Sequence, residues 1–219
     1  MKYKIKLLTG IILSAILCIC GYTFFRYQNT SPERLPDKFD GTIEQVHSTV
    51  DKDFDGIDDQ ADIMQGALSY IASKPKYKSK YYQTGYPNDD YGVCTDVVAN
   101  ALKAAGYDLM VLIQEDIKTH PNDYHIIEPD KNIDFRRVRN LKVYFSHTAK
   151  SLTTETSETE KWQGGDIVIF QNHIGIVSDR RNKNGVPYVI HHNDPWQNTY
   201  EQDILETRED IVGHYRISE

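Results

Sequence analysis

Cysteine and histidine are the side chains of this sequence whose types and positions best suit covalent chemistry. Cys94 precedes a segment, 97–105, in which apolar residues recur at helical spacing, and Gly106 stands where that helix would end. A thiol at a helix N-terminus faces unpaired backbone N–H groups and the positive end of the helix dipole, which favour the nucleophilic thiolate. The alternative is a small, buried hydrophobic side chain, since free cysteine is among the most buried residue types.

Two histidines are candidates to assist this thiol. A thiolate nucleophile needs a base, usually histidine, and the base needs a partner that orients it. His173 opens one predicted strand and His191 closes the next strand of the same predicted hairpin, so we expect the two imidazoles to be neighbours. Two histidines, one cysteine and a water are also a legitimate zinc site, so a zinc-dependent hydrolase with Cys94, His173 and His191 as ligands is an alternative.

Residues 51–62 form an aspartate-rich loop with the spacing of a calcium site. Counted from the first residue, aspartates stand at positions 1, 3, 5, 9 and 12, with a glycine at position 6. Position 12 lacks the glutamate of an EF-hand, so the loop resembles the calcium loops of thrombospondin type 3 repeats more closely. The alternative is a solvated acidic turn in which Asp62 caps the next helix. The expected ligands of a structural Ca²⁺ are Asp51, Asp53, Asp55, Ile57, Asp59 and Asp62.

The first 26 residues differ from the rest of the chain. Lys2, Lys4 and Lys6 precede an uncharged run of 19 residues from Leu7 to Phe25. This run predicts a transmembrane helix that anchors the chain in the cell membrane, with the remaining residues outside the cytoplasm. A cleaved signal peptide that leaves a secreted protein is the alternative. Both other cysteines, Cys18 and Cys20, fall in this run, so Cys94 has no disulfide partner in the remaining chain, which favours a reactive role.

The predicted organisation is a membrane anchor or signal segment at 1–26, a polar linker at 27–50 and one folded domain at 51–219. Residues 1–26 hold four basic and no acidic residues, so the remainder carries 21 Lys+Arg against 32 Asp+Glu, a formal charge of −11. An acidic domain without a basic, aromatic patch is not expected to bind nucleic acid. Predicted helices come first and predicted antiparallel strands follow, which indicates an α+β fold.

Several motifs resemble known families. Gly165-Asp-Ile-Val-Ile-Phe170, His173-Ile-Gly-Ile-Val177 and Val189-Ile-His191 resemble strands of the NlpC/P60 group of papain-like cysteine hydrolases. More closely, the chain resembles DUF1287, a bacterial family allied to that group, over about residues 50–219. Three blocks carry this second resemblance: Gly92-Val-Cys-Thr-Asp-Val-Val98, Asn132-Ile-Asp-Phe-Arg-Arg-Val-Arg-Asn140 and Gly213-His-Tyr-Arg216.

The resemblance implies a papain-like fold in which N-terminal helices that carry the cysteine pack on an antiparallel sheet. It implies that Cys94 is the nucleophile, His173 the general base and His191 the residue that orients the base, with the backbone N–H of Cys94 in an oxyanion hole. His192 and Asn193 remain alternatives for the third position. The implied activity is hydrolysis of an amide bond in cell-wall peptidoglycan, with no cofactor needed for catalysis. Acyl transfer and a non-catalytic domain that binds cell-wall peptides remain alternatives.

Overall fold

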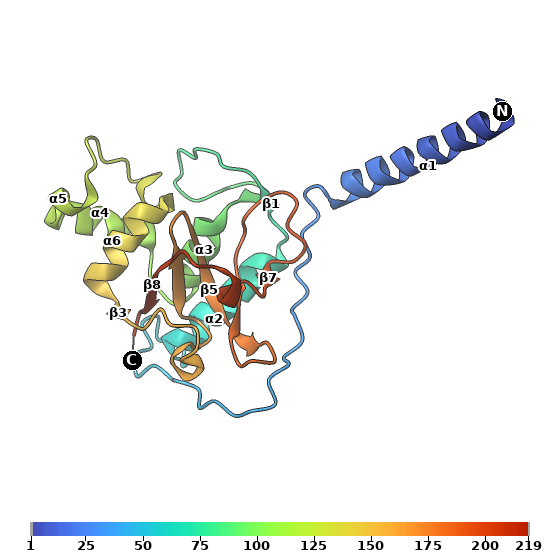
Figure 1. The fold of residues 1–219 in the computed structure, drawn as a ribbon. Helices are drawn as coiled ribbons and strands as arrows, with labels where there is room; N and C mark the ends of the chain where they lie inside the picture. The colour runs from blue at the N-terminus through green and yellow to red at the C-terminus, as the bar shows by residue number, and fades with distance from the viewer. Residues whose placement is uncertain (1, 219) are drawn as a thin grey trace.

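The computed structural model describes residues 2–218, and describes side chains from Ile11 onward. The α+β class expected from the sequence is confirmed: the described chain contains six α-helices and an antiparallel sheet of six strands (Figure 1). Three short 3₁₀ helices complete it, η1 (Asp134–Arg136), η2 (Thr159–Lys161) and η3 (Leu205–Thr207). The α-helices are α1 (Lys2–Arg26), α2 (Asp59–Ala72), α3 (Cys94–Ala104), α4 (Leu109–Thr119), α5 (Pro121–Tyr124) and α6 (Val138–Thr148).

The sheet has the strand order β3-β8-β4-β5-β6-β7, and each neighbouring pair is antiparallel. Strands β4 to β7 follow one another as a meander, while the last strand of the chain, β8, inserts between β3 and β4. A separate parallel pair joins β1 (Lys76–Tyr77) to β2 (Tyr91–Gly92), just before the cysteine helix. The sheet strands are β3 (Lys150–Ser151), β4 (Ile167–Phe170), β5 (His173–Arg181), β6 (Pro187–Ile190), β7 (Glu201–Gln202) and β8 (Ile211–Arg216).

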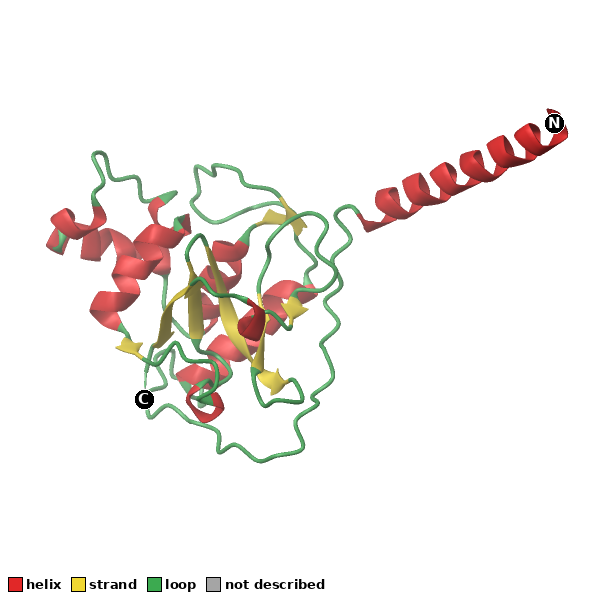
Figure 2. Ribbon diagram, in the orientation of Figure 1, coloured by secondary structure: helices red, strands yellow, loops and turns green. Residues whose placement is uncertain are grey.

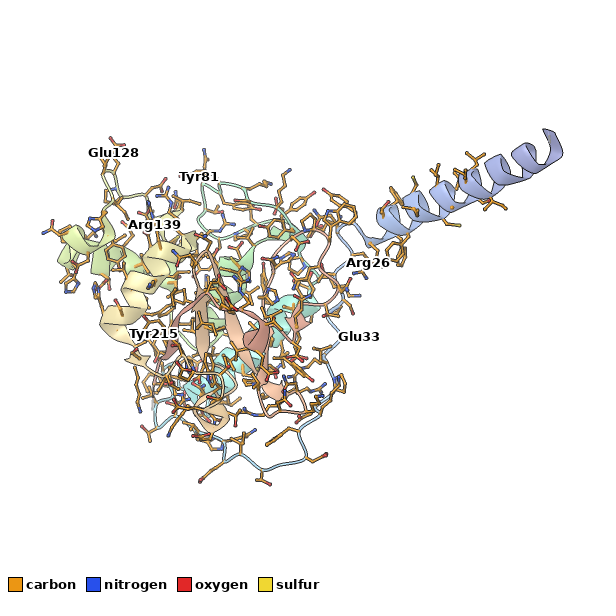
Figure 3. All side chains as sticks on the ribbon, viewed as in Figure 1. Arg26, Glu33, Tyr81, Glu128, Arg139 and Tyr215 are labelled. Carbon is orange, nitrogen blue, oxygen red and sulfur yellow. The ribbon has the colours of Figure 1, made fainter. Side chains whose placement is uncertain are left out.

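Both faces of the sheet are buried, which explains why its central strands are apolar throughout. Ile174 and Ile176 of β5 join the larger core, which lies between the sheet and helices α2 to α6. Val177, one position further along β5, joins a smaller core on the opposite face with Trp162. Figure 1 shows α2 and α3 behind the sheet, with α4, α5 and α6 gathered beyond its β3–β8 edge. Tyr215 of β8 connects these parts by packing on Phe145 of α6 (Figure 3).

The expected membrane anchor is not supported. Helix α1 extends from Lys2 to Arg26. Within the part of the chain that the structure describes, no helix combines the length and apolar character of a membrane span. The prediction of a single-pass transmembrane helix, and of a membrane location that rests on it, is therefore wrong.

Residues 27–58 contain no helix and run as a loop around the body of the protein (Figure 2). Specific polar contacts hold this loop on the sheet. Arg34 hydrogen-bonds Glu201 of β7 at 2.9 Å and Ser178 of β5 at 2.9 Å, and Ser31 forms a bridge with Thr199. Figure 3 shows Arg26 at the end of α1 and Glu33 along the first part of this loop. The segment expected to be a linker thus lies against the folded domain over much of its length.

A buried ionic cluster joins the first helix of the domain to the sheet. Asp166, immediately before β4, accepts hydrogen bonds from Arg216 and His214 of β8 at 2.8 and 2.9 Å. Its carboxylate also accepts the side-chain amide of Gln60 in α2 at 2.9 Å. Hydrogen bonds from His214 and Arg216 hold the pKa of Asp166 below its usual range, although burial raises it. The Gly-Asp and Gly-His-Tyr-Arg motifs therefore share one structural role, which is to close the sheet around this carboxylate.

Candidate active site

Cys94 is the first residue of helix α3, as predicted. The preceding residue, Val93, is extended (φ −140°, ψ −177°), and its backbone N–H donates to the carboxylate of Asp96 at 2.9 Å. That contact stands in for the side-chain cap that valine cannot provide and fixes where the helix begins. Downstream of Cys94, the side chains on one face of α3 are buried in the core, and the helix packs on α2 and β5.

A buried ion pair holds the same helix end from the other side. Arg136 of η1 donates to Asp96 through Nε at 2.7 Å and Nη2 at 2.8 Å, a bidentate geometry. Its Nη1 also donates to the carbonyl of Lys80, and both charged side chains are almost fully buried. Arg136 belongs to the block Asn132–Asn140, which carries part of the family resemblance. This block therefore helps to hold Cys94 in position and is not simply a charged part of the surface.

The sulfur of Cys94 is partly buried and lies against the start of β5. Burial raises the pKa of the Cys94 thiol to about 11, although backbone hydrogen bonds from Ile174 and Thr95 act in the opposite direction. Desolvation therefore outweighs the helix N-terminus, contrary to the expectation of a thiolate formed in advance. In the resting protein the thiol keeps its proton at neutral pH, and its use as a nucleophile requires a base.

The structure brings His173 and His191 together. Nε2 of His173 lies 2.9 Å from Nδ1 of His191, and Nε2 of His191 lies 2.9 Å from Oε1 of Gln202 in β7. An amide oxygen only accepts hydrogen bonds, so Nε2 of His191 is the donor and its Nδ1 is an acceptor. Nε2 of His173 must then donate, which leaves the lone pair of neutral His173 on Nδ1. This chain of two hydrogen bonds selects the tautomer that a general base needs.

Burial keeps both imidazoles neutral. Burial, and then the charge of Arg208, lowers the pKa of His173 to about 4. The pKa of His191 is lowered well below its ordinary value, first by burial and then by His173. At neutral pH His173 is consequently a proton acceptor rather than an imidazolium ion.

Gly175 makes room for this pair. The register of β5 and β6 places His191 opposite Gly175, two residues from His173 on the same face of the strand. A methyl group on Gly175 would lie 3.2 Å from Cβ of His191 and 2.9 Å from the carbonyl oxygen of Ile190. The glycine of the His-Ile-Gly motif is therefore explained by close packing, not by backbone conformation.

The two alternatives for the third position lie differently. Asn193 directs its side-chain amide to Asp194 at 2.9 Å. His192 is buried between the rings of Tyr77 and Tyr200, and neither of its ring nitrogens has a partner among the described residues. Burial lowers the pKa of His192 to about 4, so it is neutral. Of the three candidates, His191 is the one whose side chain hydrogen-bonds His173.

Cys94 meets the backbone of the histidine strand rather than the imidazoles themselves. The backbone of Ile174, the residue after His173, acts to lower the pKa of the thiol, and no hydrogen bond joins the sulfur to His173 or His191 within residues 11–218. Two cavities of about 390 and 480 Å³ lie elsewhere, under the loop around residues 37–47 and beside β3. The thiol of Cys94 and the imidazole of His173 therefore both lie at the start of β5.

The aspartate loop folds around the side chain of its first residue. The carboxylate of Asp51 accepts the backbone N–H groups of Asp55 and Gly56 at 3.2 and 2.9 Å, and Gly56 has a φ of +94°, which favours glycine. Carboxylate oxygens of Asp51, Asp53 and Asp55 lie within 4.8 Å of one another. Ile57 follows them and donates its backbone N–H to Asp55 at 2.8 Å.

The two remaining aspartates among the expected calcium ligands differ. Asp62 is buried, one of its oxygens has no partner among the described residues, and burial together with Asp55, Asp53 and Asp51 raises its pKa to about 6. Asp59 instead accepts hydrogen bonds from the backbone of Lys52 and the hydroxyl of Tyr107. The alternative interpretation of the loop placed a helix cap at Asp62, but Asp58 caps α2 and accepts the backbone N–H of Gln60.

Sequence reasoning missed Gln202, Arg136 and Asp96 as parts of the site. The two charged residues lie in blocks that the sequence had singled out, but nothing in their spacing shows that they pair. Gln202 belongs to a strand of two residues, too short to give a periodic signal.

Comparison with known proteins identifies the family. The family described as "Domain of unknown function (DUF1287)" matches residues 64–217, a range that includes Cys94, His173 and His191. A protein of Escherichia coli (strain K12), described as "Uncharacterized protein YijF", is 38% identical over 167 residues, which cover 70% of this chain and 80% of the relative. No solved structure matches the chain significantly. The link to the NlpC/P60 group stays a prediction, but the chain itself belongs to the DUF1287 family.

Proposed function

We propose that this protein is a cysteine hydrolase that cleaves an amide bond in a cell-wall peptide, in the manner of the NlpC/P60 group that its motifs resemble. The observation that carries the proposal is the hydrogen-bonded chain from Gln202 through His191 to His173, which leaves a basic nitrogen on His173. A general base needs a basic nitrogen and a ring that is held in place, and this chain of hydrogen bonds supplies both. The thiol of Cys94 lies against the next residue of the same strand.

The reaction begins with a proton transfer. Nδ1 of His173 accepts the thiol proton as the sulfur of Cys94 attacks the carbonyl carbon, and the carbonyl electrons move onto oxygen. The backbone N–H at the start of α3 stabilises this oxyanion. His173 then returns the proton to the departing amine, a thioester remains on Cys94, and water hydrolyses it with His173 again as the base. Neutral His191 holds the ring of His173 through both steps.

The pKa values favour proton transfer in concert with attack over a stored ion pair. The thiol has a pKa of about 11 and His173 a pKa of about 4, so the resting pair is a neutral thiol and a neutral imidazole. Substrate that covers the site must contribute to stabilising the charge as it develops. Such an enzyme reacts slowly with general alkylating agents and is activated by its own substrate.

The alternatives differ in what supports them. For a zinc hydrolase, donor atoms of Cys94, His173 and His191 would have to converge, but they do not form such a group within the described residues. The facing nitrogens of the two histidines are also engaged with each other. A non-catalytic domain that binds peptides keeps the fold but gives no reason for the alignment of Gln202, His191 and His173.

The test is digestion of purified peptidoglycan by the full-length protein with Ca²⁺ present, with released fragments identified by mass spectrometry. We expect fragments from the wild type and none from Cys94→Ala or His173→Ala. The matched control replaces the two exposed cysteines of α1, Cys18→Ala with Cys20→Ala, and should keep full activity. Peptide binding without fragments from any variant would leave the binding domain as the better reading.

A second proposal concerns the aspartate loop, where we infer a structural Ca²⁺ site. Asp51, Asp53 and Asp55 present converging oxygens, and Asp62 adds a buried carboxylate oxygen that has no protein partner among the described residues. Buried carboxylates without partners are costly, and a hard divalent cation bound by oxygens removes that cost. The ion would connect the loop to the first turn of α2, which carries Asp62. It takes no part in the cysteine chemistry.

A further inference from the structure

The helical part of the protein contains a cluster of ionisable side chains that the proposed reaction does not use. Asp116 lies in the last turn of α4, His120 is the residue at which α4 ends, and His147 lies in the last turn of α6. Their donor atoms all lie within 4.8 Å of one another. Figure 1 shows α4, α5 and α6 side by side at the edge of the fold that holds this cluster.

The two imidazoles converge on one carboxylate through the same ring atom. Nδ1 of His120 lies 3.0 Å from one oxygen of Asp116, and Nδ1 of His147 lies 2.7 Å from the other. Asp116 and His120 are four residues apart at a helix end, which places them on one face. The ring centroids of His120 and His147 are 4.6 Å apart. Two imidazole nitrogens from two helices thus gather around one carboxylate group.

The surrounding residues have the arrangement that supports metal ligands. A histidine that binds a metal usually donates its other ring N–H to a carboxylate. Nε2 of His147, on the far side of the ring, lies 3.4 Å from the carboxylate of Asp123. The hydroxyl of the buried Tyr124 donates to Asp116 and fixes the orientation of that carboxylate. Helix α5 supplies both of these supporting side chains.

The planes of the His120 and His147 rings are tilted by 48° to each other, so the rings are not stacked face to face. A metal ion bound to both Nδ1 atoms would leave Nε2 of His147 facing the carboxylate of Asp123. Ligand atoms around zinc are roughly 3.4 Å apart, so the 3.0 Å and 2.7 Å contacts of His120 and His147 with Asp116 would have to open by about 0.4 and 0.7 Å.

We propose that Asp116, His120 and His147 form a binding site for a divalent ion of the zinc type, with a fourth position open to solvent. Two imidazole nitrogens and one carboxylate oxygen are the donors that such ions prefer over Ca²⁺ or Mg²⁺. The side chain of His120 is 44% exposed, so an ion can reach the site without unfolding the helices. The bound ion would join the end of α4 to the end of α6. None of its ligands belongs to the cysteine helix α3.

The test is calorimetric titration of the full-length protein with ZnCl₂ in excess Ca²⁺, which occupies the aspartate loop. We expect one zinc site in the wild type. His120→Ala, a change at an exposed side chain, should weaken binding at least 100-fold, and Asp123→Asn about 10-fold. The matched control is His125→Asn, which removes an exposed histidine outside the cluster and keeps a residue suited to its φ of +51°. It should bind zinc like the wild type.

A second measurement separates this site from the cysteine. Co²⁺ in place of Zn²⁺ should give the visible absorption of a four-coordinate nitrogen and oxygen site without a thiolate band, and Cys94→Ser should leave it unchanged. Loss of the site in Cys94→Ser, equal binding by His120→Ala and wild type, or no zinc binding by the wild type would each overturn the proposal. Digestion of peptidoglycan is not needed for any of these results, so they stand apart from the proposed hydrolase.

Discussion

Nε2 of His173 lies 2.9 Å from Nδ1 of His191, and a third residue, Gln202, sets the direction of this hydrogen bond. Neutral His191 carries one N–H group, on Nε2, and donates it to Gln202. Its Nδ1 can therefore only accept a hydrogen bond from His173. A glutamine on a strand of two residues thereby determines which nitrogen of the candidate base is free. The relationship makes the site more than a collection of suitable residue types.

Replacement of Gln202 should reverse or randomise this direction. In Gln202→Met, His191 loses the oxygen that accepts its Nε2–H, and we expect the rate of hydrolysis to fall at least 10-fold. A general base contributes about 10²–10⁴-fold to the rate, and this change should remove part of that contribution. Gln202→Glu keeps an acceptor and should retain the tautomer. Nitrogen-15 shifts of the imidazoles report it directly: in the wild type, Nε2 of both His173 and His191 should carry the proton. The same tautomers in Gln202→Met would show that Gln202 does not set them.

Gly175→Ala should disturb His191 without altering any titratable group. The added methyl lies 2.6 Å from a methyl of Val189 and 2.9 Å from the carbonyl oxygen of Ile190, so β6 must shift. We expect a loss of about 1–3 kcal/mol in the free energy of unfolding, as for other overpacked cores, measured by urea denaturation. Gly21→Ala adds a methyl where nothing lies within 4 Å and is the control. An unchanged His173–His191 contact in Gly175→Ala would contradict the packing argument.

The alkylation of Cys94 should report a protonated thiol. With a pKa of about 11, the thiolate fraction rises about tenfold for each pH unit between 7 and 10. The rate of reaction with iodoacetamide should follow this rise without a plateau, measured on Cys18→Ala with Cys20→Ala so that one thiol remains. A plateau reached below pH 8 would instead indicate an ion pair with His173 in the resting protein.

Much of the fold could be predicted from the sequence, because its signals are local. The helix at Cys94 follows from apolar spacing, and strands β4, β5, β6 and β8 follow from short apolar runs between polar turns. The place of β8 between β3 and β4 could not be predicted, since it depends on Asp166 pairing with residues about 50 positions later. The uncharged N-terminal run also gave a strong local signal, and there the prediction of a membrane span was wrong.

The candidate site shows the same limit. The hairpin pattern was enough to predict that His173 and His191 lie next to each other, because the turn sets the register of the two strands. The helix dipole suggested a lowered thiol pKa, but burial dominates, and burial is a property of the assembled core rather than of the helix. Convergence of Asp116 and His147 from two helices, 31 residues apart, has no local signature at all.

Removal of Arg136 should destabilise the start of the cysteine helix. Arg136→Met leaves the carboxylate of Asp96 buried without its partner, which costs about 3–5 kcal/mol in comparable cases. The neighbouring Arg137 is 41% exposed and 3.7 Å from Asp134, so Arg137→Met should change stability by less than about 1 kcal/mol. Urea denaturation measures both, and hydrogen exchange should show faster opening near Cys94 only in the first variant. Equal losses in the two variants would refute the supporting role of the buried pair.

The stability of the calcium-free protein should fall as the pH rises from about 4 to about 6. Burial and the neighbouring aspartates raise the pKa of folded Asp62 to about 6, against an ordinary value of 3.8, so the folded state binds more protons in this interval. Stability is therefore lost as that proton leaves, and the loss is complete above pH 6.

Calcium should remove this loss, because the cation takes the place of the proton. At about 100 times its Kd, a ligand that binds only the folded state adds about 2.7 kcal/mol, which thermal denaturation at pH 7 with and without Ca²⁺ would detect. Asp62→Asn should abolish both the pH dependence and the calcium effect, whereas Asp90→Asn, at an exposed aspartate outside the loop, should preserve them. If Asp62→Asn still gains stability from Ca²⁺ as the wild type does, the cation binds without the buried carboxylate and the proposed coordination is wrong.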